Sequence, residues 1–379
     1  MISTTVSVTM LAMYLTGYNA VYADIDGISM DDGSTEEVVD PEGKENAVLY
    51  AENIYRDMLG MVMADQDSFG TEIENENDII LGEAFIIYDE LREVQEASYY
   101  LPLYDGDEVV LTMNVLQSEN GWSASLGTEM VDELNQVEYK ANGGVAYYTQ
   151  DEIVMENSTG SIELMKETED APSNRGEFAL LPYAEKEEIV EDSDDQVELI
   201  DTDNERGAIG ETGYSPSVLL NDRYAYLYTQ DCYVSQGSYN LCWAASIATI
   251  YRYRTGNRTK TAINVADDIN HDYSSANDTD IEKAFMKEKL LYRRRLFLTY
   301  DAIKKNIRGK WPVMLIGRIP TRNTKHAVTI IGYNESNSTE LVQVWDSASE
   351  NKKILTYGEG NAFKTNNVTY TMIYEFSYK

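Results

Sequence analysis

Two side chains in the C-terminal half of the chain have the types and spacing needed for catalysis by a thiol. Cys242 opens an apolar run that continues to about Tyr251 and is typical of a buried helix, and Gln236 stands six positions before the cysteine. The dipole and the free N–H groups of a helix N-terminus favour the thiolate, which is the reactive form. The amide of Gln236 can donate a hydrogen bond to an oxyanion that forms beside this thiol. We therefore predict that Cys242 is a nucleophile.

A cysteine nucleophile needs a base, and the chain contains two histidines. His326 begins the apolar run 326–333, which predicts a strand, so its ring would be anchored yet reachable. His271 lies in the polar sequence Asn-His-Asp-Tyr-Ser-Ser, which is typical of a surface loop. We predict that His326 is the general base and acid, and we expect His271 to be an ordinary surface residue.

The base in turn needs an acceptor that orients its ring. Asp346 directly follows the apolar run 341–345, which predicts the strand after the one that begins at His326. Because strands that follow one another in the chain commonly pair, the two side chains can lie next to each other. We predict that Asp346 accepts a hydrogen bond from the second nitrogen of His326.

These motifs together resemble the papain-like cysteine peptidases, which share the chain order Cys, His, then Asn or Asp. The similarity lies in Gln236-x5-Cys-Trp and in His326-Ala-Val-x3-Gly-Tyr, and it covers roughly residues 230–379. The small size of this half and its Cys-Trp-Ala-Ala sequence are more similar to bacterial secreted members, such as the staphopain-like and bacteriocin-processing peptidases, than to plant papains.

The resemblance implies a role for each matched residue. Cys242 would be the nucleophile, His326 the base and acid, and Gln236 with the Cys242 N–H the oxyanion hole. Asp346 differs from papain, which has an asparagine as the third member, but an aspartate occurs in the bacteriocin-processing branch. The substrates would be proteins or peptides.

Other interpretations of the same residues remain open. Cys232 and Cys242 could form a disulfide bond, since an exported chain with an even number of cysteines invites pairing. The three catalytic residue types also fit an acyl transferase such as a transglutaminase, or an exported binding or adhesion protein with an inactive papain-like fold. Two cysteines ten positions apart and two distant histidines match no recognised zinc spacing, so we predict no metal and no cofactor.

The formal net charge of −36 is divided unevenly along the chain. Acidic residues greatly outnumber basic ones in residues 1–212, whereas basic residues exceed acidic ones in residues 213–379. This asymmetry predicts two folded units that attract each other, or an acidic part that solubilises the protein. It disfavours a nucleic-acid partner, because phosphate binding needs clustered positive charge.

Composition divides the chain into four parts. Residues 1–23 are uncharged and moderately apolar and end in a small-x-small pattern, so we predict a signal peptide and a secreted, bacterial protein. Residues 24–183 form an acidic N-terminal domain, 184–212 an acidic linker, and 213–379 the catalytic domain. No later run is long and apolar enough for a stable membrane span.

Periodicity predicts an α+β fold with a papain-like catalytic domain after a mainly antiparallel β prodomain. In the N-terminal domain a helix over 45–65 precedes short apolar runs separated by turns, at 79–81, 84–88, 98–101, 109–115, 122–126 and 145–149. In the catalytic domain, helices come first and the strands of an antiparallel sheet later. We expect helices from Cys242 to about residue 255 and over 262–270, 279–290 and 300–307, then strands over 311–317, 326–333, 341–345, 353–357 and 368–376.

An acidic domain joined by an exposed linker to a basic catalytic domain suits a propeptide. We therefore predict a zymogen in which the N-terminal domain inhibits the enzyme intramolecularly until a cut within about residues 200–215. The sequence leaves open a second role for the N-terminal half, as a permanent domain for attachment or substrate capture.

Overall fold

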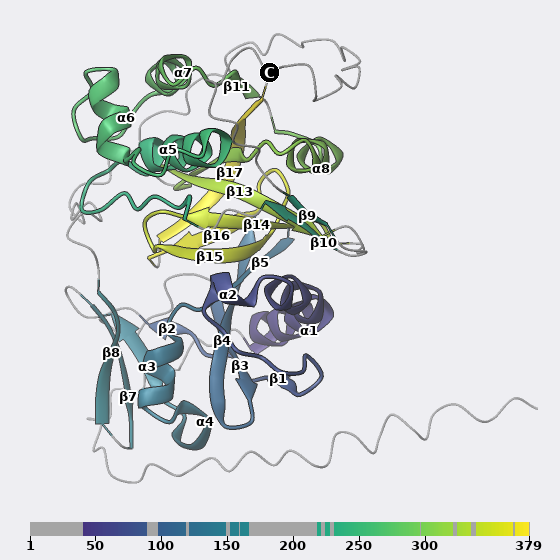
Figure 1. Cartoon of the computed structure of the whole chain (residues 1–379). Coiled ribbons are helices and arrows are strands. Elements are labelled where there is room, and N and C mark those ends of the chain that lie inside the picture. The colour runs from purple at the N-terminus through teal and green to yellow at the C-terminus, as the bar shows by residue number, and fades with distance from the viewer. Residues whose placement is uncertain are drawn as a thin grey trace, which may run out of the picture. The chain divides into compact units, whose positions relative to one another are not determined.

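A long antiparallel β-sheet runs through the computed structural model and receives strands from both halves of the chain (Figure 1). Its main path has the strand order β1-β3-β4-β5-β15-β14-β13-β12-β17-β11. The structure describes residues 41–88, 98–118, 121–148, 152–158, 160–166, 218–220, 224–227, 231–295, 297–320, 324–334, 339–366 and 368–378. All of them belong to one compact unit that spans residues 39–379.

The N-terminal half contributes one end of this sheet and a helix that packs on it. The helix α1 (Pro41–Met63) buries Ala47, Ala51, Ile54 and Met58, whose spacing of three or four residues places them on one face. Its strands are β1 (Ile79–Leu81), β3 (Ser98–Asp105), β4 (Glu108–Ser118) and β5 (Gly121–Gly127), and the short α2 (Gln66–Phe69) follows α1. The turn between β3 and β4 uses Gly106 at φ 57°, a conformation that glycine adopts readily.

A second, smaller sheet covers the other face of β3 and β4. Its strand order is β2-β6-β7-β8, and its core includes Tyr100 and Tyr104 from β3. Its elements are β2 (Ile87–Tyr88), α3 (Val131–Gln136), α4 (Tyr139–Asn142), β6 (Val145–Tyr148), β7 (Glu152–Asn157) and β8 (Gly160–Lys166). The pairing of β2 with β6 is parallel.

In the C-terminal half, helices pack on both faces of the sheet. Met314 and Ile316 share a core with α5 (Cys242–Thr255), α6 (Ala262–Asp268) and α7 (Asp278–Lys287), whereas Val313 and Leu315 share one with α8 (Tyr300–Arg308). This division follows from the alternation of side chains along a strand. The strands are β9 (Val218–Leu220), β10 (Tyr224–Leu227), β11 (Tyr292–Arg295), β12 (Val313–Arg318), β13 (Lys325–Asn334), β14 (Leu341–Asp346), β15 (Asn351–Thr356), β16 (Ala362–Thr365) and β17 (Val368–Tyr378).

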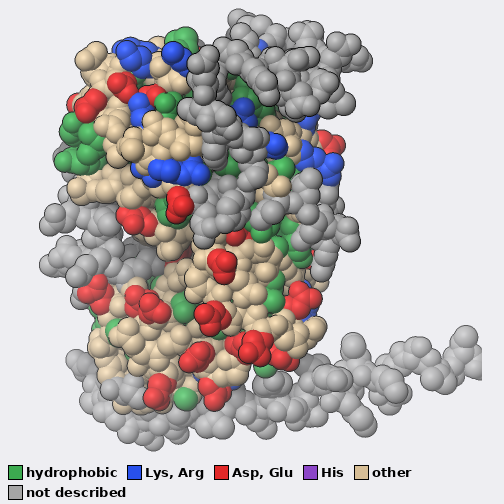
Figure 2. Space-filling model, viewed as in Figure 1, with side chains coloured by type: hydrophobic (Ala, Val, Ile, Leu, Met, Phe, Trp, Pro, Cys, Tyr) green, Lys and Arg blue, Asp and Glu red, His purple; other side chains and the backbone are tan. Residues whose placement is uncertain are grey.

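The two halves meet along β5 and β15. Leu126 pairs with Ile354 and Ser125 with Leu355, so β5 continues the sheet of the C-terminal half. On the face shown in Figure 2, most acidic side chains lie over the N-terminal elements and most basic ones over the C-terminal elements. The sheet is therefore continuous across two parts of the chain that differ in charge.

The mixed α+β fold with a large antiparallel sheet is as predicted, and every helix and strand that the sequence predicts has a counterpart. The sequence did not predict β7 to β11 or β16. It also did not predict that the N-terminal strands would join the sheet of the catalytic half. The predicted signal peptide, linker and cleavage region lie outside the described residues. Among the described helices, none is both long and apolar enough to cross a membrane.

Candidate active site

Cys242 occupies the first position of α5, where backbone N–H groups have no partner within the helix. Burial raises the pKa of its thiol, but a hydrogen bond and charge from His326 and the backbone N–H groups of Ala327 and Trp243 outweigh burial and lower it. These are the surroundings that stabilise a thiolate. The structure thus gives the thiol the environment that the start of a helix predicts.

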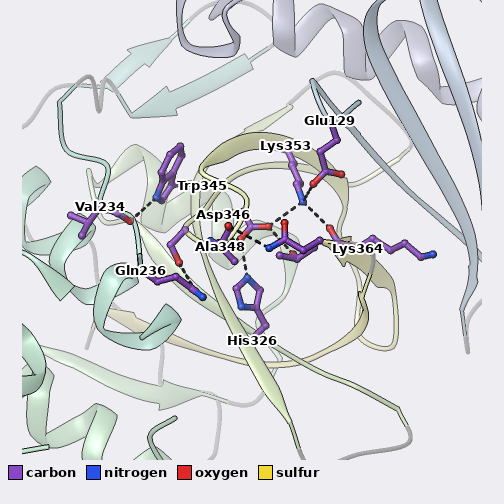
Figure 3. Close-up of polar contacts among 12 residues, drawn as sticks. Glu129, Val234, Gln236, His326, Trp345, Asp346, Ala348, Lys353 and Lys364 are labelled. Carbon is purple, nitrogen blue, oxygen red and sulfur yellow. Dashed lines mark hydrogen bonds and ion pairs between the residues drawn. The ribbon is translucent and has the colours of Figure 1, made fainter. Parts of the chain in front are cut away.

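His326 and Asp346 come from neighbouring strands. β13 and β14 pair antiparallel, and His326 Nε2 lies 2.9 Å from Asp346 Oδ1 (Figure 3). The His326 side chain also forms a hydrogen bond with the Cys242 thiol. Burial lowers the pKa of His326, but Asp346 and the thiol outweigh it and raise the pKa to about 10. The imidazole is therefore stabilised in its protonated form, between two negative groups.

Asp346 is completely buried, and both of its oxygens accept hydrogen bonds. Oδ1 accepts from His326 and from the Ala348 N–H (3.1 Å), and Oδ2 accepts from Thr365 Oγ1 (2.7 Å) and Lys353 Nζ (3.1 Å). Burial raises the pKa of this carboxyl, but Lys353 and His326 outweigh it and hold the pKa well below its usual range. The carboxylate is thus ionised and fixed in orientation.

Gln236 lies in the loop before α5, and that loop is attached to the end of β14. The Gln236 N–H donates to the Ser347 carbonyl (3.2 Å), and Ser347 Oγ donates to Gln236 Oε1 (3.4 Å). The Trp345 indole N–H donates to the Val234 carbonyl (3.1 Å), and its ring stacks on Tyr233 with ring centroids 4.4 Å apart. These contacts hold the amide of Gln236 in the same part of the molecule as the Asp346 carboxylate.

Two aromatic side chains lie against His326. The Tyr370 ring centroid is 5.1 Å from that of His326, and Phe363 stacks on Tyr370 with centroids 5.7 Å apart. Gly317 pairs with His326 across β12 and β13, and a Cβ on this glycine would lie 2.8 Å from the Phe363 ring. Glycine at this position therefore allows Phe363 to pack beside the histidine. Burial raises the pKa of Tyr370, and the negative charges of Cys242 and Asp346 raise it further.

The other histidine and the other cysteine lie elsewhere. His271 lies in the loop between α6 and α7, where it packs edge-on against Trp243 with centroids 5.2 Å apart, and its side chain is 14% exposed. Cys232 is buried, and both it and Cys242 are free thiols, which excludes the disulfide interpretation in this structure. In the part of the chain that the structure describes, no group of three or more His, Cys, Asp or Glu side chains could hold a metal ion.

The structure thus places Cys242, His326 and Asp346 in contact in series and Gln236 against Ser347, the residue after Asp346, and it adds other residues that the sequence did not predict. Thr365 and Lys353 contact Asp346, and Tyr370 contacts His326. The sequence does contain a signal for Lys353, because two adjacent lysines precede Ile354 and Leu355 within the strand Asn351–Thr356. A buried lysine needs an anionic partner.

Comparison with known protein families adds independent evidence for this half of the chain. A family model described as "Peptidase_C39 like family" matches residues 227–375. The C-terminal half thus resembles a cysteine peptidase. The matched segment contains Cys242, His326 and Asp346, and its mixed α+β structure is consistent with a papain-like peptidase domain. No curated protein matches the chain.

Proposed function

We propose that this protein is a secreted cysteine endopeptidase that hydrolyses peptide bonds in protein or peptide substrates. The observation that carries the proposal is the position of His326 between two groups. One ring nitrogen bonds the buried Asp346 carboxylate at 2.9 Å, and the ring also bonds the Cys242 thiol at the start of a helix. A nucleophile, its base and the group that orients the base therefore stand in series.

The proposed reaction begins from a Cys242 thiolate and a protonated His326. The thiolate attacks the peptide carbonyl carbon, and the Gln236 amide with the Cys242 N–H stabilises the oxyanion. His326 then gives its proton to the leaving amine as the C–N bond breaks, which leaves a thioester. Neutral His326 next takes a proton from water, which attacks the thioester, and collapse releases the acid and restores the ion pair. Asp346 keeps the ring oriented throughout.

The pKa shifts set the pH range of this ion pair. It exists above the lowered pKa of the Cys242 thiol and below the raised pKa of His326, which is about 10. On the alkaline side, His326 loses the proton that the leaving amine needs. Activity is therefore expected to fall as the pH rises through about 10.

Covalent labelling tests the proposal directly. An epoxide inhibitor of cysteine peptidases should modify Cys242 in the full chain and should fail to modify a Cys242→Ala variant. Cleavage of casein should disappear in the same variant, whereas incorporation of an amine without cleavage would indicate an acyl transferase. A chain that neither reacts with the epoxide nor cleaves casein, both before and after a cut within about residues 200–215, would be an exported binding protein with an inactive papain-like fold.

The sequence predicts export with a signal peptide over residues 1–23 and silencing by the N-terminal half until a cut within about residues 200–215. One observation favours the other role that the sequence leaves open, a permanent domain. The pairing of β5 with β15 makes the N-terminal strands part of the catalytic sheet. Sequencing of the mature N-terminus, together with activity measured before and after the cut, distinguishes the two roles.

A further inference from the structure

Lys353 is a buried lysine in β15 with three hydrogen-bond acceptors around its ammonium group. Nζ lies 2.6 Å from Glu129 Oε1, 2.8 Å from the Lys364 carbonyl oxygen and 3.1 Å from Asp346 Oδ2. Its side chain is only 2% exposed. An ammonium group has three N–H donors, so each donor has one partner. The three partners come from three different parts of the chain, and Asp346 is the one that orients His326.

The contacts form a series of charges that begins at the thiol and ends in the N-terminal half. In Figure 3, Lys353 and Glu129 lie on the opposite side of Asp346 from His326. From Cys242 through His326, Asp346 and Lys353 to Glu129, the signs of the ionised groups alternate. Each group therefore has an opposite charge on either side, except the two at the ends.

Glu129 is held in position by the N-terminal half. It follows β5 by two residues, and its carbonyl accepts a hydrogen bond from Thr112 Oγ1 of β4 (2.5 Å). Pairing of β5 with β15 places this segment beside Lys353. Burial lowers the pKa of Lys353, but Glu129 and then Asp346 outweigh it and raise the pKa, so Glu129 is the larger of the two stabilising charges.

The balance of charge around Asp346 decides how well this carboxylate supports His326. A positive charge on Lys353 attracts Asp346 and opposes a second positive charge on the nearby imidazole. Glu129 offsets that charge, which leaves the carboxylate free to stabilise the imidazolium. Without Glu129, the ammonium would depend on Asp346 as its only anionic partner among these contacts.

We propose that Lys353 and Glu129 are positioning residues of the catalytic triad, and that the N-terminal half uses Glu129 to keep His326 protonated for catalysis. The inference rests on the proposed cysteine peptidase. In this proposal the N-terminal half contributes to the active enzyme, because Glu129 contacts Asp346 through Lys353 on the side of the carboxylate away from His326.

Other groups also face the carboxylate, and they belong to elements that the proposed variants leave unchanged. His326 reaches it from β13 and Thr365 from β16, while Tyr370 of β17 lies close enough to interact electrostatically with both Asp346 and the Cys242 thiol. Lys364 contributes its backbone carbonyl to Lys353, and its own ammonium lies over the Tyr100 ring, 5.6 Å from the centroid.

The neighbouring lysine supplies a matched control. Lys352 Nζ lies 2.5 Å from Asp65 Oδ2, so this ion pair also joins β15 to an acidic residue of the N-terminal half. Lys352 also lies over the Tyr233 ring, 4.9 Å from its centroid, and its anionic partner is Asp65, whereas that of Lys353 is Asp346 together with Glu129. Asp65→Asn therefore weakens the same interface as Glu129→Gln without removing a charge from the series.

The experiment is a titration of His326 in the full chain by NMR with histidine labelled at the imidazole carbons. The chain has two histidines, so a His271→Gln variant assigns the signals. In Glu129→Gln the pH at the midpoint of the His326 titration should fall by on the order of half a pH unit. This is less than the 1–3 units by which a directly adjacent charge shifts a pKa, because Glu129 acts through Lys353 and Asp346. The alkaline limb of kcat/KM should move to lower pH by the same amount. In Asp65→Asn neither should move.

A double variant separates the electrostatic effect from damage to the fold. Lys353→Met added to Glu129→Gln removes the unbalanced positive charge and keeps a side chain of similar volume, so the midpoint of His326 should return to the original value or above it. Equal midpoints in the original protein and Glu129→Gln, equal shifts in Glu129→Gln and Asp65→Asn, or no recovery in the double variant would each overturn the inference.

The titration does not depend on substrate turnover, so the two proposals can fail separately. A chain with no peptidase activity whose His326 midpoint still responds to Glu129 refutes the proposed function alone. An active peptidase whose midpoint and alkaline limb are the same in Glu129→Gln refutes the role of Glu129 alone.

Discussion

Cys232 and Cys242 are the same residue type ten positions apart, yet their surroundings give the two thiols opposite properties. Cys232 is completely buried in an apolar core, where burial raises the pKa of its thiol to about 11 despite nearby Arg258 and Arg252. Burial also opposes ionisation of Cys242, but His326 and backbone N–H groups outweigh it. The contrast shows that the neighbours of a thiol, more than its burial, determine whether it can act as a nucleophile.

Removal of His326 should make the Cys242 thiol as hard to ionise as that of Cys232, and it should have the largest effect on activity. In His326→Gln the Cys242 thiol loses its base and its main stabilising charge, so peptide hydrolysis should fall on the order of 10⁶-fold, as when a triad member is removed from a serine peptidase. His271→Gln, assayed on the same substrate, is the control and should keep most of the activity. Similar losses in the two variants would contradict the assignment of His326 as the base.

The rates of alkylation measure the difference in ionisation between Cys232 and Cys242 directly. At pH 7 a thiol with a pKa of about 11 is ionised to only about one part in 10⁴, so Cys232 should react with iodoacetamide far more slowly than Cys242, whose pKa is lowered. Mass spectrometry of the modified peptides gives both rates in one sample. Raising the pH towards 11 should narrow the difference, provided the fold persists. Comparable rates for the two thiols at pH 7 would mean that Cys242 is an ordinary cysteine.

Gln236→Ala tests whether the surroundings of Cys242 also stabilise an oxyanion. Loss of one side-chain donor should lower kcat by about 10²-fold or more and leave alkylation of Cys242 nearly unchanged, because the thiolate does not depend on this amide. Steady-state kinetics and the alkylation rate, measured together, provide the check. If both quantities fell together, Gln236 would be acting on the thiol or on the local fold.

The smallest effect is expected at the buried thiol. Cys232→Ser places a hydroxyl in an apolar core and should lower the free energy of unfolding by about 1–3 kcal/mol, with kcat/KM unchanged. Denaturant unfolding measures the loss, and Cys232→Ala serves as the variant that removes the polar group. A loss of activity in a stably folded Cys232→Ser protein would show that this thiol contributes to the reaction.

The sequence was sufficient to predict the residues of the site that lie at the ends of regular elements. The apolar run after Cys242 predicts a helix, and the runs beginning at His326 and ending before Asp346 predict two strands that follow one another. The structure pairs those strands as β13 and β14. Local patterns and the pairing of successive strands therefore bring the histidine and the aspartate together.

The contacts on the other side of Asp346 could not be predicted in the same way. Glu129 and Lys353 are more than 200 positions apart, and they meet because β5 pairs with β15. Neither strand has a pattern that specifies this partner. β11 was missed for a different reason, because its sequence Tyr-Arg-Arg-Arg carries three positive charges and lies at the end of the sheet, where charged strands are common.

The position of β5 also has a consequence for the solubility of the protein. A strand at the border of a sheet presents unpaired N–H and C=O groups, which can bind a strand of another molecule and start aggregation. In the main path of the sheet, β5 occupies this border of the C-terminal half, next to β15. Whether or not the linker is cut, a C-terminal half without β5 would expose the unpaired edge of β15. Association of two such edges would then compete with folding.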